Sequence, residues 1–350
     1  MVADAAPSRV LVVGAGLTGA LVSRSLRRLL PASSRVVVWE ADANVGGRMR
    51  CERHGTSVTD VGAQYITPTG DNSDLCDELR RAGLLVPLSG RIDGTRAADG
   101  GGQNFVSPDG LQAIVAHLLE GTPVECGRAA APLKLSSDRW SAGGDETFDG
   151  VVLTPPVPQL LPLLGEAAAS LDAPTRAALD GVEFSARYAL SCFYGAEAAP
   201  IFARELDWVS RYIPKDEDDA LVFLSHDSAK RGAATPPSLL AHTSVPFGLR
   251  HLRAGTPDAD VQADLLARLS KLLPWLPPPE RVALHAWKNS QVRTPLELPG
   301  GAAALLGGGT TPPVVLAGDS FAPTLGSRFD GCAQSADAAA AALVAALAKE

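Results

Sequence analysis

The feature that most constrains the fold is an apolar segment near the N-terminus that runs directly into a glycine pattern. Residues 9–13 read Arg-Val-Leu-Val-Val, and residues 14–19 read Gly-Ala-Gly-Leu-Thr-Gly before an Ala- and Leu-rich segment begins. A strand, a Gly-x-Gly-x-x-Gly turn and a helix in this order are typical of a βαβ unit that binds a nucleotide diphosphate at the helix N-terminus. A glycine-rich turn without a ligand has the same pattern. The candidate diphosphate contacts are Gly14, Ala15, Gly16, Thr18 and Gly19.

A second apolar segment ends in an acidic residue at the spacing that this unit requires. Residues 36–39 precede Glu40, which lies about 20 residues beyond Gly19. A carboxylate at this position binds a ribose diol in dinucleotide-binding proteins. The alternative is an ordinary charge at the end of a buried parallel strand.

Two further patterns favour a flavin dinucleotide over a nicotinamide dinucleotide. Gly46, Gly47 and Arg48 follow the acidic residue, as in the two-dinucleotide-binding flavoproteins, where the glycines lie near the diphosphate and the arginine near the flavin. Near the other end, the apolar residues 313–317 lead into Gly318-Asp319. In FAD proteins of this class, that aspartate reaches the ribityl–phosphate link and the next helix points its positive end at the flavin. The ordered set predicts FAD.

Composition excludes several classes of function. The chain has 350 residues, of which 46% are hydrophobic, and a formal net charge of −8, so a nucleic acid or an anionic membrane is not an expected partner. No apolar stretch approaches the length of a membrane span. Residues 1–8 have no basic end or hydrophobic run, so we expect a cytoplasmic protein. The five cysteines lack a C-x-x-C and the six histidines lack an i,i+4 pair, so no metal site is expected.

The order of expected elements defines the fold class. After the βαβ unit, β-rich segments at 185–194, 207–213, 220–226 and 238–245 predict a mainly antiparallel sheet. We therefore predict an α/β fold: a Rossmann-type FAD-binding domain of the two-dinucleotide-binding flavoprotein kind with an inserted α+β, mainly antiparallel substrate domain. The Gly-rich residues 93–102 are expected to form a surface loop. The expected FAD-binding domain is 1–70, 103–157 and 294–350, and the expected substrate domain is 71–102 and 158–293.

Polar and aromatic residues of the insert are candidates for the wall of a substrate pocket. A bound flavin supplies its own electron sink, so the protein needs to orient a reductant and exclude water. His242 lies in an apolar strand, where a structural histidine is the commoner outcome, and Tyr188 on an alternating strand is more often a core residue than a pocket residue. The candidates are Gln64, Tyr65, Tyr188, His242, Phe247, Trp287, Asn289 and Gln291.

Several segments in the same order along the chain resemble the renalase family: 62–67, 104–106, 185–190, 245–248, 287–292 and 329–332. The resemblance covers essentially the whole chain. It implies an enzyme with non-covalent FAD that oxidises the 2- and 6-dihydro isomers of NAD(P)H to NAD(P)⁺, with dioxygen as acceptor and hydrogen peroxide as product. Among the candidates above, we expect Tyr65, His242, Trp287 and Asn289 to form the walls around the donor ring. The further expected contacts with FAD are Gly62, Ala63, Gln64, Tyr65, Ala130, Asp330 and Gly331.

Two other functions remain open at this point. A flavin amine oxidase or another FAD-dependent dehydrogenase has the same cofactor fingerprint, although residues 294–317 lack the cysteine through which monoamine oxidases attach FAD. A flavin-binding interaction protein without turnover is the second alternative. Residues 93–102, 129–131 and 294–313 depart from the family pattern, which leaves the preference for NAD or NADP isomers open. The expected partners are a small dinucleotide and dioxygen, and the oligomeric state is not predicted.

Overall fold

The computed structural model describes residues 6–68, 73–94, 102–232, 235–298, 301–308, 311–322 and 327–348. The chain forms two compact units, one of residues 1–47, 115–183 and 292–350, the other of residues 48–114 and 184–291. These units differ from the expected domains at 48–70 and 103–114, which fall in the second unit, and at 158–183, which falls in the first. Residues 48–70 include a hairpin that packs on the sheet of the second unit. Most of the expected loop at 93–102 lies outside the described residues.

The first unit is built on a mainly parallel sheet. Its strand order is β19 (Ala304–Leu306), β20 (Val314–Leu316), β11 (Gly150–Leu153), β1 (Arg9–Val13), β2 (Arg35–Glu40) and β8 (Val124–Cys126). All neighbours pair in parallel except β19 with β20. The strands read as continuous apolar runs because both faces of a parallel sheet are buried, and Val10, Leu11 and Val12 are fully buried.

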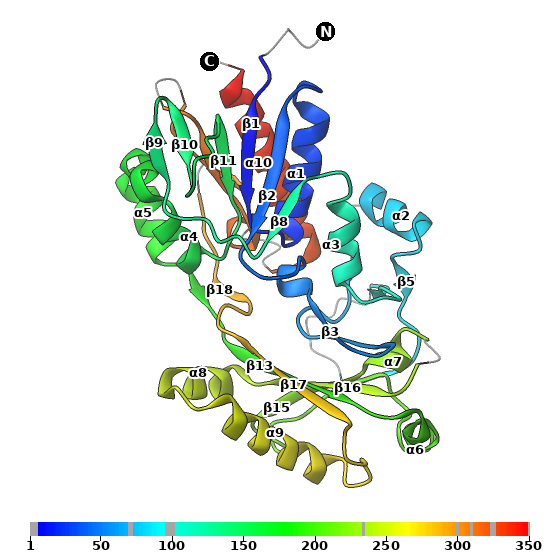
Figure 1. The fold of residues 1–350 in the computed structure, drawn as a ribbon. Helices are drawn as coiled ribbons and strands as arrows, with labels where there is room; N and C mark the ends of the chain where they lie inside the picture. Colours follow the sequence, from blue (N-terminus) through cyan, green and yellow to red (C-terminus); the bar gives the residue numbers. More distant parts are fainter. Residues whose placement is uncertain are drawn as a thin grey trace. The chain divides into compact units, whose positions relative to one another are not determined.

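Helices and short elements complete the first unit. Helices α1 (Leu17–Leu29) and α10 (Phe329–Leu347) pack side by side beside the sheet (Figure 1). α10 presents small buried residues such as Ala336 and Ala340, which allow helices to approach closely. The other elements are β9 (Lys134–Ser136), β10 (Arg139–Ser141), α4 (Val157–Leu163), η2 (Gly165–Ser170), α5 (Ala173–Asp180), β18 (Val292–Thr294) and η4 (Asp319–Phe321).

The second unit contains the expected antiparallel sheet. Its order is β17 (Arg281–Trp287), β13 (Arg187–Phe193), β16 (Ser238–Thr243), β15 (Leu221–His226), β14 (Ser210–Tyr212) and β6 (Ile92–Asp93). Only β14 and β6 pair in parallel among these neighbours. The prediction of a Rossmann-type domain with a mainly antiparallel insert is therefore confirmed.

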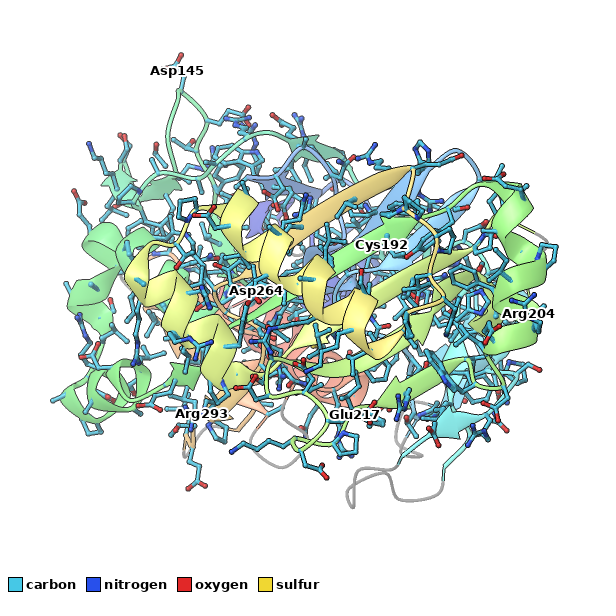
Figure 2. The ribbon with its side chains drawn as sticks, turned by 90° about the horizontal axis from the view of Figure 1, so that it is seen from below. Asp145, Cys192, Arg204, Glu217, Asp264 and Arg293 are labelled. Atoms are coloured by element: carbon cyan, nitrogen blue, oxygen red, sulfur yellow. The ribbon has the colours of Figure 1, made fainter. Side chains whose placement is uncertain are left out.

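The alternation of β13 gives the two faces of this sheet different partners. Leu190 and Cys192 face a core formed with α9 (Asp258–Leu272) through Val261, Leu265 and Leu269. Figure 2 shows α8 (Val245–Ala254) and α9 lying across this face, with Asp264 labelled on α9 and Cys192 on the strand beneath.

The other face of the sheet is covered by a hairpin of β3 (Cys51–His54) and β4 (Ser57–Asp60) and by α7 (Asp227–Lys230). There the Thr59 and Ser191 hydroxyls lie 2.7 Å apart. The remaining elements are η1 (Gly47–Met49), α2 (Ser73–Arg81), β5 (Val86–Pro87), β7 (Phe105–Val106), α3 (Gln112–Leu118), β12 (Glu183–Phe184), η3 (Ala196–Ala198) and α6 (Ala199–Glu205).

Candidate active site

Four strands of the first unit end at one edge of its sheet. Val13 of β1 lies in register with Trp39 of β2 and with Leu153 of β11, and Leu153 lies in register with Leu316 of β20. The residues that follow these strands therefore gather along the carboxyl edge, where open α/β sheets bind their ligands. Gly14, Thr154 and Gly318 follow β1, β11 and β20, and Glu40 is the last residue of β2.

The glycine turn after β1 has the geometry of a diphosphate cradle. The Gly14 amide donates to the Trp39 carbonyl at 2.8 Å. A Cβ at position 19 would lie 1.9 Å from the Gly14 carbonyl oxygen, so only glycine allows α1 to start this close to the turn. Gly16 is the N-cap of α1 and forms no side-chain cap among the described residues. The first-turn N–H groups thus suit an anion.

Glu40 fixes the turn through both carboxylate oxygens. Its Oε2 accepts the Ala15 amide at 2.7 Å, and its Oε1 accepts the Asp42 amide at 2.9 Å. The sequence pattern indicates a ribose contact but not this contact with the turn. A carboxylate has about four lone-pair sites, so both roles are compatible.

The Gly-Gly segment packs on the same turn. The Gly46 amide donates to the Ala15 carbonyl at 2.9 Å, and a Cβ on Gly47 would lie 3.0 Å from the Gly16 Cα. The backbone amide of Arg128 also donates to the Glu40 carbonyl at the end of β2, at 2.8 Å. The half-buried Ala130 follows Arg128 by two residues. The structure therefore brings together the N-terminal members of the expected cofactor set.

The C-terminal members are buried acids next to helix starts. Asp319 begins η4 and accepts the Ser327 hydroxyl at 2.5 Å. Asp330 lies in the first turn of α10, followed by the buried Gly331. Both side chains are at most 2% exposed, and a negative charge at a helix N-terminus is stabilised by the helix dipole.

In the second unit, one backbone carbonyl orients two of the expected substrate-wall residues. The Val61 oxygen accepts Trp287 Nε1–H at 2.8 Å and His242 Nε2 at 3.0 Å. A carbonyl only accepts, so His242 carries its proton on Nε2. Burial lowers the pKa of His242 to about 4, and the imidazole is therefore neutral at pH 7.

The same sheet face carries a row of rings across neighbouring strands. Strand pairing places His242 opposite Ala189 and Phe223, and Tyr212 lies opposite Phe223. The ring centroids of Phe223 lie 6.0 Å from His242 and 5.0 Å from Tyr212. We call Trp287, His285, His242, Phe223 and Tyr212 the aromatic row.

One further ring contact lies within this row, and one hydroxyl contact extends it to Tyr65. His285 and Trp287 lie 4.1 Å apart between centroids, and the Tyr65 hydroxyl lies 2.7 Å from that of Tyr212. The sequence argument missed Phe223, Tyr212 and His285. These three residues come together only through the pairing register of β17, β13, β16, β15 and β14. The sequence of any one strand does not show that register.

The Gly62 segment lies against Trp287 and Arg48. A Cβ on Gly62 would lie 1.9 Å from the Arg48 carbonyl oxygen and 3.3 Å from the Trp287 ring. The Arg48 guanidinium contacts the Ser290 carbonyl at 3.4 Å. Asn289 lies in the turn just before Ser290, and the Ala63 amide donates to the Arg48 carbonyl at 3.0 Å.

Other expected wall residues lie elsewhere. Tyr188 and Phe247 pack together in the core on the opposite face, with centroids 6.3 Å apart. The pocket assignment for these two rings is therefore incorrect, because the alternation of β13 directs Tyr188 away from the aromatic row. The Gln291 backbone joins Ser185, whose amide donates to the Gln291 carbonyl at 2.8 Å.

Neither a metal centre nor a spanning helix is found in the described part of the chain. No group of three or more His, Cys, Asp or Glu residues there is arranged to hold a metal ion. Within the same residues, no helix combines the length and apolar character needed to cross a membrane.

Comparison with known proteins agrees with this arrangement. The model of an NAD(P)-binding Rossmann-like domain matches residues 12–82, and the model of flavin containing amine oxidoreductases matches residues 92–344. Renalase from Mus musculus is 34% identical over 348 residues, which cover 94% of this chain and 96% of the mouse protein. Peroxisomal N(1)-acetyl-spermine/spermidine oxidase from Bos taurus is 39% identical over 77 residues, 22% of this chain and 15% of that protein.

Solved structures share the fold. A chain described as a protoporphyrinogen oxidase from Exiguobacterium sp. 255-15 matches with a TM-score of 0.72 and 13% identity, covering 98% of this chain and all of that chain. A double mutant of putrescine oxidase matches with a TM-score of 0.68 and 14% identity, covering 97% and 99%.

The Rossmann-type sheet, the glycine cradle and these matches define an FAD-dependent oxidoreductase. The diphosphate cradle, in which position 19 has no space for a side chain, fits the cofactor. The chain belongs to the flavin-containing amine oxidoreductases and, within them, to the renalase family.

Proposed function

We propose that this protein oxidises 2- and 6-dihydroNAD(P), the isomers of NAD(P)H, to NAD(P)⁺ and reduces dioxygen to hydrogen peroxide. The C–H bond of the dihydropyridine breaks and its hydrogen leaves with two electrons. Dioxygen takes up these two electrons and, overall, one further proton from solvent. Bound FAD supplies the two-electron acceptor that links these half-reactions.

The aromatic row is the observation that carries this proposal. Flat rings in offset or edge-on contact provide a surface for a planar heterocycle, and Trp287 and His242 are held by one carbonyl oxygen. The product is a pyridinium cation, which aromatic faces attract. A neutral His242 adds no repulsive charge to that product. We therefore assign the donor ring to Tyr65, His242, Trp287 and Asn289.

The cofactor contacts are proposed for both ends of the chain. In the first unit we assign FAD to Gly14, Ala15, Gly16, Thr18, Gly19, Glu40, Gly46, Gly47, Ala130, Gly318, Asp319, Asp330 and Gly331. In the second unit we assign it to Arg48, Gly62, Ala63, Tyr65 and the backbone of Gln64. We propose non-covalent attachment, since residues 294–317 contain no cysteine. The cytoplasmic location stays a prediction that cell fractionation tests.

Anaerobic reduction of the bound flavin tests the proposal. Mixing the holoprotein with 6-dihydroNAD is expected to bleach the flavin absorbance within seconds. Ordinary NADH, the 4-dihydro isomer, is the matched control donor and is expected to reduce the flavin far more slowly. Reduction by primary amines instead would identify an amine oxidase. A flavin that no donor reduces would indicate a binding protein without turnover.

A further inference from the structure

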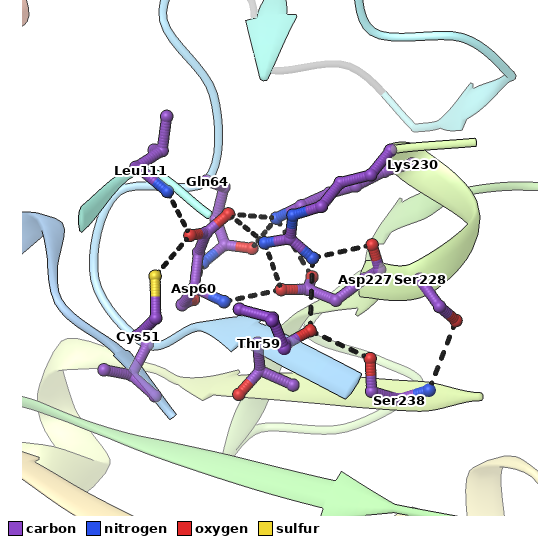
Figure 3. Close-up of polar contacts among 12 residues, drawn as sticks. Cys51, Thr59, Asp60, Gln64, Leu111, Asp227, Ser228, Lys230 and Ser238 are labelled. Carbon is purple, nitrogen blue, oxygen red and sulfur yellow. Dashed lines mark hydrogen bonds and ion pairs between the residues drawn. The ribbon is translucent and has the colours of Figure 1, made fainter. Parts of the chain in front are cut away.

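Four charged side chains are buried together beneath the loop that carries Val61. Asp60, Asp227 and Lys230 have fully buried side chains, and that of Arg231 is 2% exposed. Lys230 Nζ lies 3.1 Å from Asp60 Oδ2 and 3.0 Å from Asp227 Oδ1, and Arg231 pairs with both acids (Figure 3). We call these four residues the ionic cluster. Its formal charges sum to zero.

Asp60 of the ionic cluster is held in its charged form. Burial alone would raise the pKa of Asp60, but Lys230, Arg231 and the hydrogen bonds from Leu111 and Cys51 together lower it below its ordinary value. Asp60 Oδ1 also accepts the Leu111 amide at 2.8 Å. Apolar residues of similar volume often stabilise a fold as well as a buried ion pair does, so stability alone does not explain the cluster.

Gln64 connects the ionic cluster to the loop of residues 60–64. Lys230 Nζ donates to Gln64 Oε1 at 3.2 Å. Gln64 Nε2 donates to the Gly62 carbonyl at 3.1 Å and also to the Asp60 carbonyl. An ammonium only donates and a carbonyl only accepts, so one orientation of the amide satisfies all three contacts.

The contacts of Gln64 enclose Val61 from both sides. The two carbonyls that Gln64 binds belong to Asp60 and Gly62, the neighbours of Val61. The backbone of Asp60 is held further, since its amide donates to Asp227 Oδ2 at 2.6 Å. Through these contacts the ionic cluster and Gln64 fix the direction of the Val61 carbonyl. This carbonyl accepts hydrogen bonds from both Trp287 and His242.

We propose that Lys230 and Gln64 are positioning residues that orient Trp287 and His242 through the Val61 carbonyl. The importance of this orientation for catalysis rests on the proposed function, whereas the orientation itself does not. The role is specific to an amide at position 64, because a carboxylate there faces two carbonyl oxygens and an apolar side chain donates to neither.

The test compares Gln64→Leu and Gln64→Glu with the wild-type holoprotein. The chain has five tryptophans, so Trp287→Phe identifies the Trp287 indole signal in a ¹H–¹⁵N spectrum. We expect both variants to shift this signal and to speed exchange of the indole proton by about tenfold or more, because the hydrogen bond to Val61 opens more often.

Ser238→Ala is the matched control. The Ser238 hydroxyl donates at 3.0 Å to the Val58 carbonyl of β4, which also accepts Arg231 Nη1 at 3.1 Å, so this variant disturbs the surroundings of the ionic cluster without altering the Gln64 amide. We expect this variant to lower the denaturation midpoint without changing the Trp287 signal. The positioning role of Gln64 is wrong if Gln64→Leu and Gln64→Glu show the same Trp287 indole shift and the same exchange rate as Ser238→Ala.

Kinetics separate this inference from the proposed function. With 6-dihydroNAD, we expect the limiting rate of flavin reduction to fall about 10- to 100-fold in Gln64→Leu, with a smaller change in the donor concentration at half-maximal rate. If the indole signal changes but wild-type flavin is not reduced by this donor, the proposed function fails and the positioning role stands. If the indole signal changes in Gln64→Leu but the limiting rate of flavin reduction does not, the orientation of Trp287 and His242 by Gln64 is not important for catalysis.

Discussion

The carboxylate of Glu40 accepts the backbone amide of Ala15 at 2.7 Å, so the acid at the end of β2 is part of the turn that begins α1. This contact makes the cradle and the acid one structural feature. A substitution at Glu40 therefore changes the shape of the turn as well as any contact with a ribose.

Glu40→Ala is expected to weaken FAD retention while leaving the fold largely intact. The variant removes two charge-assisted hydrogen bonds, each of which contributes about 1.5–3 kcal/mol, and leaves the Ala15 and Asp42 amides without this acceptor. Glu40→Gln, which keeps one acceptor, is the matched variant and is expected to lose less affinity. FAD titration of the apoprotein and gel filtration of the holoprotein measure the effect. Retention equal to wild type in Glu40→Ala would contradict the role of this residue.

Gly62→Ala is expected to destabilise the second unit. The new Cβ would lie 1.9 Å from the Arg48 carbonyl oxygen, and overpacking of this kind costs about 1–3 kcal/mol. Gly181→Ala is the control, because its Cβ meets carbonyl oxygens at an ordinary 3.5 Å. Urea denaturation is expected to show a clear drop in the midpoint for Gly62→Ala only, and equal midpoints would argue against the close approach.

Stability is expected to fall as the pH drops from about 6.5 toward 4. Burial lowers the pKa of His226 and of His242 to about 4 from the ordinary value of 6.5. The unfolded chain therefore binds protons first as the pH falls, and the stabilisation present above pH 6.5 is lost progressively. Denaturation midpoints between pH 7 and 4 measure this. His226→Gln and His242→Gln are each expected to flatten the profile, and an unchanged slope would exclude their contribution.

Breaking the ionic cluster is expected to cost far more than breaking a surface pair. Lys230→Met leaves Asp60 and Asp227 with one cation fewer in a buried site, a loss of about 3–5 kcal/mol. Arg176→Met breaks one exposed pair, with Asp180, which is expected to contribute about 1 kcal/mol or less. Thermal and urea unfolding compare the two, and similar losses would show that the cluster is not energetically distinct.

The main features of the first unit can be predicted from the sequence because the patterns that indicate them are short and local. The turn at 14–19 and the acid at Glu40 lie within one βαβ unit, so their spacing predicts their meeting. The Gly318-Asp319 pair is recognised by the apolar strand before it. The contact between Glu40 and Ala15 was missed, since no pattern specifies which amide a carboxylate accepts.

The second unit depends on register, which a single sequence leaves open. Trp287 and His242 are recognisable as candidates, but their common acceptor at Val61 is far from both along the chain. Phe223 and Tyr212 join the aromatic row only after five strands are aligned. The ionic cluster was missed because Asp227, Lys230 and Arg231 resemble an ordinary charged surface turn until their burial is known.

The shared acceptor at Val61 also determines what His242 is able to do. Its single ring proton is committed to a backbone oxygen, which leaves Nδ1 with a lone pair and no hydrogen. At neutral pH the His242 side chain therefore has no proton to give to a ligand. A ligand that forms a hydrogen bond with Nδ1 must be the donor in that bond. A carboxamide N–H group meets that requirement, whereas a carboxylate does not.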